Sequence, residues 1–195
     1  MKFKNNVDLI IILVFTTLTL ISCNQILETN VGKNEVLSEA QTRIDIYKQE
    51  ARLLLKASRA NLDILELCED IKYVDTLNKV RDLTSTLEKT HFEISKNYNE
   101  IASDKLISIP NSVIVDNEFD ELKEIDQESF IKNKLKVILN KTETQMQLLD
   151  TLGNITENVE FKVLAIQDTP TLKSNINKIE ITLNKFNQQT YNLRY

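Results

Sequence analysis

The scarcity of glycine and proline is the feature that most limits how this chain can fold. Its 195 residues include two glycines, Gly32 and Gly153, and two prolines, Pro110 and Pro170. A sheet protein of this size needs many tight turns, and glycine usually supplies the positive-φ positions in them. The sequence therefore predicts a few long elements joined by few turns, which means α-helices.

The composition also excludes several kinds of functional site. A glycine-rich phosphate loop, a dinucleotide-binding fingerprint and a nucleophile elbow each need glycines that the chain does not contain. One histidine, His91, and two cysteines are too few for a zinc site unless several carboxylates converge. No nucleophile can be matched with a base, so we expect no catalytic activity and no cofactor. The net charge of −5 argues against nucleic acid as a partner, because phosphate binding needs clustered Lys and Arg.

Apolar residues spaced by three or four positions predict the first two helices. One run extends from Leu37 to Leu65 and predicts a helix over 35–70, with Glu50 and other charged residues on its opposite face. The next run has the alternating steps of a bundle seam and comprises Tyr73, Leu77, Val80, Thr84, Leu87, His91, Ile94, Tyr98 and Ile101. Neither glycine nor proline marks the break that we place at 71–72.

Two further seams follow a connecting segment at 104–127. Asp126 is the expected N-cap of the third helix, whose seam is Ile131, Leu135, Ile138, Thr142, Gln145, Leu149 and Leu152. Gly153 either ends this helix or lies inside it. We expect continuation with a bend, because the apolar period resumes at Ile155, Val159, Val163 and Ile166. Thr169 as N-cap and Pro170 as first helical residue predict the start of the last helix, whose seam is Leu172, Ile176, Ile179, Leu183, Phe186, Thr190 and Leu193.

The four seams predict the fold class. One helix cannot bury its own apolar stripe, whereas several helices packed antiparallel can do so, at crossing angles of about 20°. We therefore expect an all-α protein, an elongated antiparallel bundle of four to five helices that occupies residues 35–195. The polar seam residues Thr84, Gln145 and Thr190 are expected to fix the register of the helices.

His91 and Cys68 each allow two interpretations. His91 is either a ligand, base or pH sensor, or a buried polar residue that is hydrogen-bonded to a neighbouring helix. Cys68 is either reactive or paired with another molecule, or a small buried apolar residue. We favour the second interpretation of each, because no second catalytic group can be matched to His91 and no intrachain disulfide partner is left for Cys68.

The N-terminal residues have the layout of a secretory signal peptide. Lys2 and Lys4 precede an almost uninterrupted apolar run, Leu9 to Leu20, which is too short for an ordinary transmembrane helix. A small residue then stands directly before Cys23, as in bacterial lipoprotein signals, so Cys23 is the expected site of lipid attachment. We predict a signal peptide at 1–22 and a lipidated polar tether at 23–34, with two or three acyl chains that hold the protein at a membrane.

The segment 104–127 and the C-terminus are the expected sites of partner contact. The segment lacks a helical seam but keeps apolar residues beside carboxylates, which suits an interface, and we select Ile107, Val113 and Val115. The C-terminal turn carries Tyr191, Arg194 and Tyr195, and aromatic and Arg side chains are enriched at binding hot spots. The alternative is that the segment folds back over one end of the bundle and that the C-terminal side chains pack there.

The chain resembles a known protein family. Its signal ending Leu18-Thr19-Leu20-Ile21-Ser22-Cys23, its polar tether and its Asn-, Lys- and Ile-rich helical remainder resemble the surface lipoproteins of Borrelia spirochaetes. Residues 149–159 and 172–186 are similar in texture to the C-terminal helices of the complement-regulator-acquiring lipoproteins of that group. The resemblance implies a non-catalytic lipoprotein, anchored in the cell outer membrane and exposed at the cell surface, that binds a host serum or matrix protein such as complement factor H.

Two functions from different classes therefore remain as hypotheses. The first is a lipid-anchored helical protein that binds a host protein in immune evasion or adhesion. The second is a structural or self-assembling envelope lipoprotein that faces the periplasm, since long heptad seams also suit self-assembly. Surface proteolysis of intact cells separates the two hypotheses.

Overall fold

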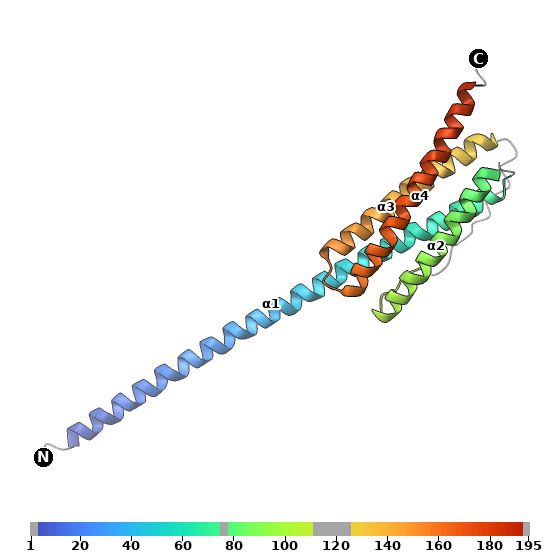
Figure 1. The fold of residues 1–195 in the computed structure, drawn as a ribbon. Coiled ribbons are helices and arrows are strands. Elements are labelled where there is room, and N and C mark those ends of the chain that lie inside the picture. The colour runs from blue at the N-terminus through green and yellow to red at the C-terminus, as the bar shows by residue number, and fades with distance from the viewer. Residues whose placement is uncertain (1–3, 75–77, 111–125, 193–195) are drawn as a thin grey trace. The chain divides into compact units, whose positions relative to one another are not determined.

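The structure is a computed structural model that describes residues 4–74, 78–110 and 126–192. Side chains are described from Val36 onward, except those of Asn187 and of residues 189–192. Four helices follow one another in the described residues: α1 (Lys4–Lys72), α2 (Asn78–Asp104), α3 (Gln127–Ile155) and α4 (Val159–Asn192) (Figure 1). No strand occurs among these residues, so the all-α prediction is confirmed.

The chain divides into two compact units, Met1–Tyr47 and Lys48–Tyr195. In the first unit, α1 begins at Lys4, whereas the sequence predicted a helix start at Glu35 after a non-helical tether. This boundary was wrong for a physical reason. The first 72 residues contain no proline, and a lone glycine such as Gly32 lowers helix stability by only about 1 kcal/mol.

The second unit is a four-helix bundle whose core forms two apolar clusters. Cluster 1 contains Ile64, Cys68, Ile71, Val80, Leu83, Leu87, Ile131, Leu135, Ile138, Ile179, Leu183 and Phe186. Cluster 2 contains Leu54, Ala57, Ile94, Tyr98, Ala102, Leu149, Leu152, Phe161, Leu164 and Leu172. With increasing residue number, α1 and α4 therefore run from cluster 2 to cluster 1, and α2 and α3 run from cluster 1 to cluster 2.

Neighbouring helices of the bundle are antiparallel, as the sequence predicted. α4 packs against both α2 and α3. α1 is tied to α3 by two ion pairs, Lys134–Asp70 at 2.6 Å and Lys141–Asp63 at 2.5 Å. Because α2 and α3 run in the same direction, the end of α2 and the start of α3 lie at opposite ends of the bundle.

The buried stripe of α1 differs from the predicted one. It follows Glu50, Leu54, Ala57, Asn61, Ile64, Cys68 and Ile71. Leu62 and Leu65, which were assigned to the seam, are half-buried, and Glu50, which was assigned to the solvent face, is 6 % exposed. The Thr156 hydroxyl donates a hydrogen bond to Glu50 Oε1, so this carboxylate ties α1 to the turn between α3 and α4.

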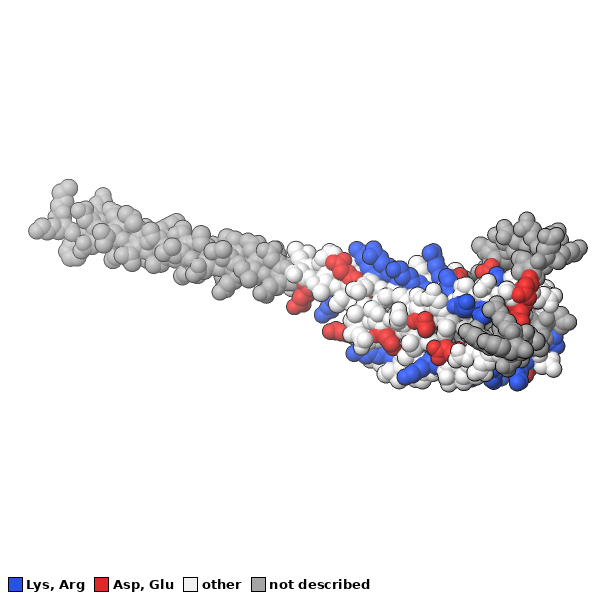
Figure 2. Space-filling view, turned by 90° about the horizontal axis from the view of Figure 1, so that it is seen from above, with Lys and Arg blue, Asp and Glu red and all other residues white. Residues whose placement is uncertain are grey.

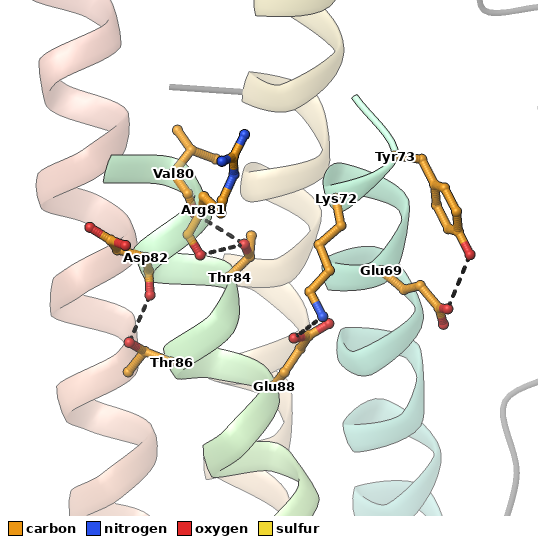
Figure 3. Close-up of polar contacts among 9 residues, drawn as sticks. All are labelled: Glu69, Lys72, Tyr73, Val80, Arg81, Asp82, Thr84, Thr86 and Glu88. Atoms are coloured by element: carbon orange, nitrogen blue, oxygen red, sulfur yellow. Dashed lines mark hydrogen bonds and ion pairs between the residues drawn. The ribbon is translucent and has the colours of Figure 1, made fainter. Parts of the chain in front are cut away.

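The seam of α2 is confirmed from Val80 to Tyr98, but its first predicted member is wrong. Tyr73 is 65 % exposed in the turn after α1, where its hydroxyl lies 3.4 Å from Glu69 Oε1 (Figure 3). The second predicted member, Leu77, lies outside the described residues. The ion pair of Lys72 with Glu88 joins the end of α1 to α2 (Figure 3).

Thr84 was expected to fix helix register, and the structure gives it a different role. Its hydroxyl donates to the carbonyl oxygens of Val80, at 3.1 Å, and Arg81, at 3.0 Å, both in its own helix (Figure 3). A hydroxyl that is satisfied within one turn of α2 makes no link to another helix. Thr84 is therefore a buried polar residue without a register function, and the side chain of Thr190 lies outside the described set.

The third helix agrees with the prediction at every seam position. Its buried residues are Ile131, Leu135, Ile138, Thr142, Gln145, Leu149 and Leu152. Asp126 is the N-cap, and its carboxylate accepts hydrogen bonds from the Glu128 amide at 3.1 Å and the Ser129 hydroxyl at 2.7 Å. These hydrogen bonds favour the charged form and hold the pKa of Asp126 below its usual value.

The turn between α3 and α4 corrects two predictions. The chain does not continue as one bent helix, because α3 ends at Ile155 and α4 begins at Val159. Asn158 is the N-cap of α4, because its side-chain oxygen accepts hydrogen bonds from the amides of Glu160 at 2.9 Å and Phe161 at 3.4 Å. Pro170 lies inside α4 rather than at the start of a helix.

Gly153 lies within α3 for a packing reason. A Cβ atom at this position would stand 2.9 Å from the Cβ of Ala165, which is closer than two carbon atoms approach. The absence of a side chain therefore lets α3 and α4 pack tightly beside their connecting turn. Glycine serves here as a contact residue and not as a helix terminator.

Candidate functional site

The structure places the predicted partner-contact residues only in part. Ile107 follows a turn in which Leu106 has φ of 55°, and its amide donates to the Ala102 carbonyl oxygen at 2.8 Å. Ile107 and Ile109 pack against cluster 2, which favours the alternative that this end of the segment covers the bundle. Val113, Val115, Arg194 and Tyr195 lie outside the described residues, as do the side chains of Cys23 and Tyr191.

A layer of polar side chains lies between the two apolar clusters. Its centre is Asn61 of α1, a residue that the sequence analysis did not single out. The Asn61 amide nitrogen donates to the backbone oxygen of His91 at 2.8 Å and to the Ser95 hydroxyl at 2.6 Å. The Asn61 side-chain oxygen lies 2.7 Å from His91 Nδ1 and accepts a hydrogen bond from Gln145 Nε2 at 3.0 Å.

These contacts determine the protonation of His91. The oxygen of Asn61 can only accept, so His91 Nδ1 carries the proton and donates it, and Nε2 is left as an acceptor. His91 is completely buried, and burial lowers its pKa from 6.5 to about 3 because the charged ring would lose its hydration. The favoured interpretation of His91, a buried polar residue bonded to a neighbouring helix, is confirmed.

Gln145 belongs to the same layer, and Asp168 and Cys68 are buried elsewhere in the bundle. Gln145 Nε2 also donates to the Tyr98 hydroxyl at 3.0 Å, so Gln145 links α3 to both α1 and α2 as the register prediction required. Asp168 of α4 is 4 % exposed, and burial raises its pKa to about 6 although Asn97 donates a hydrogen bond to it. Cys68 is completely buried and its pKa is raised to about 12 by burial, so it is the inert apolar residue that was favoured.

Acid should destabilise the bundle through His91. Above pH 6.5 the ring is neutral in both states and adds no pH dependence. As the pH falls from 6.5 toward 3, the unfolded chain takes up a proton that the native site refuses, so stability is lost by about 1.4 kcal/mol per pH unit. Urea unfolding of the wild type and of His91→Gln at pH 7, 6, 5 and 4 measures this loss as a difference between the two proteins.

The wild type must be compared with His91→Gln because Asp168 changes the stability with pH in the direction opposite to His91. Its native pKa is raised, so its contribution to stability is present at low pH and is lost as the pH rises from 3.8 through about 6. His91→Gln keeps a donor for Asn61 but does not titrate, and it should therefore remove only the histidine component. Parallel stability profiles for the two proteins would contradict the burial of a neutral His91.

An exposed apolar surface lies on the first half of α4. Val159 and Ile166 are 72 % and 73 % exposed, and Val163 between them is 43 % exposed. The sequence analysis assigned all three to a buried seam, which was wrong because Phe161, Leu164 and Leu172 form the buried stripe instead. Their spacing of four and three residues places them on one line along the helix. We call these three residues the α4 ridge.

A hollow lies on each side of the α4 ridge. Val159 and Val163 line the first hollow together with α2 residues, among them Glu100 and Asp104. Ile166 lines the second hollow together with α3 residues, among them Asp150. The ridge thus has apolar side chains at its centre and charges of both signs at its rim, where Lys162 lines the second hollow and Lys105 pairs with Glu160. This arrangement of apolar and charged side chains is typical of a surface that binds another molecule.

Figure 2 shows basic and acidic side chains interspersed over the visible face of the bundle. In the part of the chain that the structure describes, no three His, Cys, Asp or Glu side chains converge as metal ligands, and no helix has the length and apolarity to span a membrane.

No family model, no curated protein and no solved structure matches the chain.

Proposed function

We propose that this chain is a lipid-anchored bacterial surface protein that binds a host protein, in immune evasion or adhesion. The anchor is supported by the sequence before Cys23, which has the charged start, short apolar run and small residue of a lipoprotein signal. Binding is supported by the fold. A bundle whose buried groups are engaged in packing and hydrogen bonding has its outer faces left for recognition.

The α4 ridge is the observation that carries the binding proposal. Monomeric proteins scatter single apolar residues over their surface, but an aligned set with a charged rim is typical of an interaction site. Val159, Val163 and Ile166 supply the apolar centre, and Glu100, Asp104 and Asp150 supply a rim of carboxylates. A partner that fits has an apolar patch whose rim includes Lys or Arg opposite these carboxylates and an acidic group opposite Lys162.

A complement regulator such as factor H is the first partner to test. This choice follows from the resemblance to complement-regulator-acquiring lipoproteins, and the ridge gives it a place to bind. Plasminogen and matrix proteoglycans follow from the same resemblance and serve as further probes in the same assay.

Polar substitution of the ridge should abolish partner binding without changing the fold. The double variant Val159→Ser, Ile166→Ser removes two exposed apolar contacts, and interface centres of this kind often contribute more than 1 kcal/mol for each residue. We expect affinity for purified factor H, measured on a biosensor with residues 24–195, to fall by about tenfold or more. Circular dichroism and the melting temperature should stay unchanged.

The matched control is Ile181→Ser, which changes a 46 % exposed residue farther along α4. It should leave binding intact. A second variant, with Ile107, Val113 and Val115 all changed to Ser, tests the segment selected from the sequence. If only this triple variant loses binding at unchanged stability, the partner contacts the segment 104–127 and the ridge assignment is wrong. If wild type binds none of the three probes, the proposed partner class is wrong.

The second candidate function, a self-assembling envelope lipoprotein, is favoured by one observation on α1. Within the first unit, Val36, Leu37, Ile44 and Tyr47 are all more than 40 % exposed. Leu37, Ala40, Ile44 and Tyr47 have the spacing of a short heptad seam, which could pair with a second copy of the chain. The two candidates differ in the side of the outer membrane on which the bundle lies.

A further inference from the structure

Every helix of the bundle contributes a buried side-chain amide or imidazole to the layer between the apolar clusters. Asn61 stands between Ala57 and Ile64 on α1, and His91 stands between Leu87 and Ile94 on α2. Gln145 lies between Ile138 and Leu149 on α3. Asn175 lies between Leu172 and Ile179 on α4, and all four are at most 1 % exposed.

Independent contacts show that these residues lie at the same level of the bundle. The Thr169 hydroxyl donates to Asp150 at 3.1 Å, so in this antiparallel pair Gln145, five residues before Asp150, stands opposite position 174. Asn97 is hydrogen-bonded to Asp168, so His91, six residues before Asn97, also stands opposite position 174. Asn175 is the neighbouring residue, and it points into the core.

Three atoms of the layer have no hydrogen-bond partner among the described residues. They are His91 Nε2, Gln145 Oε1 and Asn175 Nδ2. The contacts of Asn61 make Nε2 of His91 an acceptor, and the Gln145 oxygen is an acceptor as well. The Asn175 amide nitrogen is a donor. Leaving such groups buried and unpaired is unfavourable, so this set calls for a ligand.

We infer that the polar layer binds one buried water molecule between His91, Gln145 and Asn175. A water molecule has two hydrogens to donate and accepts at its oxygen, which matches two acceptors and one donor. Three hydrogen bonds are the usual number for a buried water. An ion does not match, because a cation is repelled by the amide donor and an anion by the two acceptors.

The bound water completes the hydrogen-bond network of the layer. Asn61, His91 and Gln145 are already joined to one another, whereas Asn175 Nδ2 of α4 has no hydrogen bond to them among the described residues. The water is therefore the link that includes α4 in the network. Sliding α4 along the bundle would move Asn175 into an apolar cluster, so the hydrated layer fixes the register of all four helices.

Solution NMR of the intact 24–195 chain tests the site directly. A water molecule held in the layer should give nuclear Overhauser cross-peaks from the water resonance to the His91 ring protons and the Asn175 side-chain amide. The carbon-bound ring protons of His91 do not exchange with water, whereas the side-chain amide protons of Asn175 do, so the sign of the cross-peak in the rotating frame is used there to separate dipolar contact from exchange. Absence of these cross-peaks in the folded wild-type protein would overturn the inference.

Asn175→Leu removes the donor and should abolish the cross-peak at His91. The matched control is Asn177→Leu, because Asn177 is exposed two residues away on the same helix, and its cross-peaks should persist. A cross-peak at His91 that survives in folded Asn175→Leu would show that the water does not join α4 to the layer, and it would also overturn the inference. If Asn175→Leu does not fold, the wild-type spectrum and the Asn177→Leu spectrum still decide the question.

Discussion

Replacing Cys23 by alanine should release the protein from membranes entirely. The thiol of Cys23 is the attachment point for the proposed lipid, and alanine has no thiol to acylate. Each buried methylene of an acyl chain adds about 0.8 kcal/mol of membrane affinity, so two or three chains bind almost irreversibly. Detergent phase partitioning of cell lysates should move the variant from the detergent phase to the aqueous phase.

Cys68→Ala is the matched control for this experiment. It removes the other cysteine, which is completely buried in the bundle core and is not available for acylation. This variant should stay in the detergent phase. If Cys23→Ala still enters that phase, the lipoprotein proposal is wrong. If both variants leave it, the loss reflects misfolding, and the helical circular dichroism spectrum of each would reveal this.

The wild-type protein in the same cells also separates the two candidate functions. A protease added to intact cells reaches the outer face of the outer membrane only. Removal of the protein supports the host-binding function, because the α4 ridge must face the host. Protection from protease supports the periplasmic envelope function and contradicts host binding, whereas a change at Cys23 would affect both functions alike.

The sequence predicted the seams of α2 and α3 well because each helix offers one apolar stripe. In α3 the polar positions separate this stripe clearly from the solvent face, and all seven seam residues are buried. In α1 the run Leu53-Leu54-Leu55 supplies apolar residues on several faces, so the period is clear but its direction is not. Packing against α2 and α3 then selects the stripe that contains Asn61 and Glu50.

The turns were less predictable, because glycine and proline are not used here as turn residues. Gly153 permits the close contact with Ala165, and Pro170 lies within α4. The actual hairpin is made by side-chain hydrogen bonds of Thr156 and Asn158. These residue types are ordinary helix caps, but the strong Thr169-Pro170 signal, which begins eleven residues after Asn158, favoured the wrong start.

The candidate sites were only partly predictable for related reasons. His91 and Gln145 were recognised as polar members of apolar seams, whereas Asn61 and Asn175 were not, because asparagine is mostly a surface residue. Their positions three or four residues from apolar neighbours were the available signal. The α4 ridge was hidden because Val159, Val163 and Ile166 repeat with the same period as a buried seam. Periodicity identifies an apolar stripe but does not say whether another helix covers it.

Truncation of Ile179 should produce a large loss of stability. Ile179 is completely buried in cluster 1, between α4 and the other helices. Ile179→Ala removes buried apolar surface and leaves a cavity, which typically lowers the free energy of unfolding by about 2–5 kcal/mol. For a domain of this size each kcal/mol corresponds to about 2–4 °C in melting temperature. Thermal and urea unfolding followed by circular dichroism measure both quantities.

Ile181→Ala makes the same chemical change two residues away and isolates the effect of burial. Ile181 is 46 % exposed, so its truncation removes little buried surface and leaves no cavity. Alanine is also the better helix former by a few tenths of a kcal/mol, so this variant should match or slightly exceed the wild type in stability. The gap between the two alanine variants therefore measures whether α4 is buried on the face that contains Ile179. Equal melting temperatures would mean that α4 packs through a different face, and the α4 ridge would then lose its status as an exposed surface.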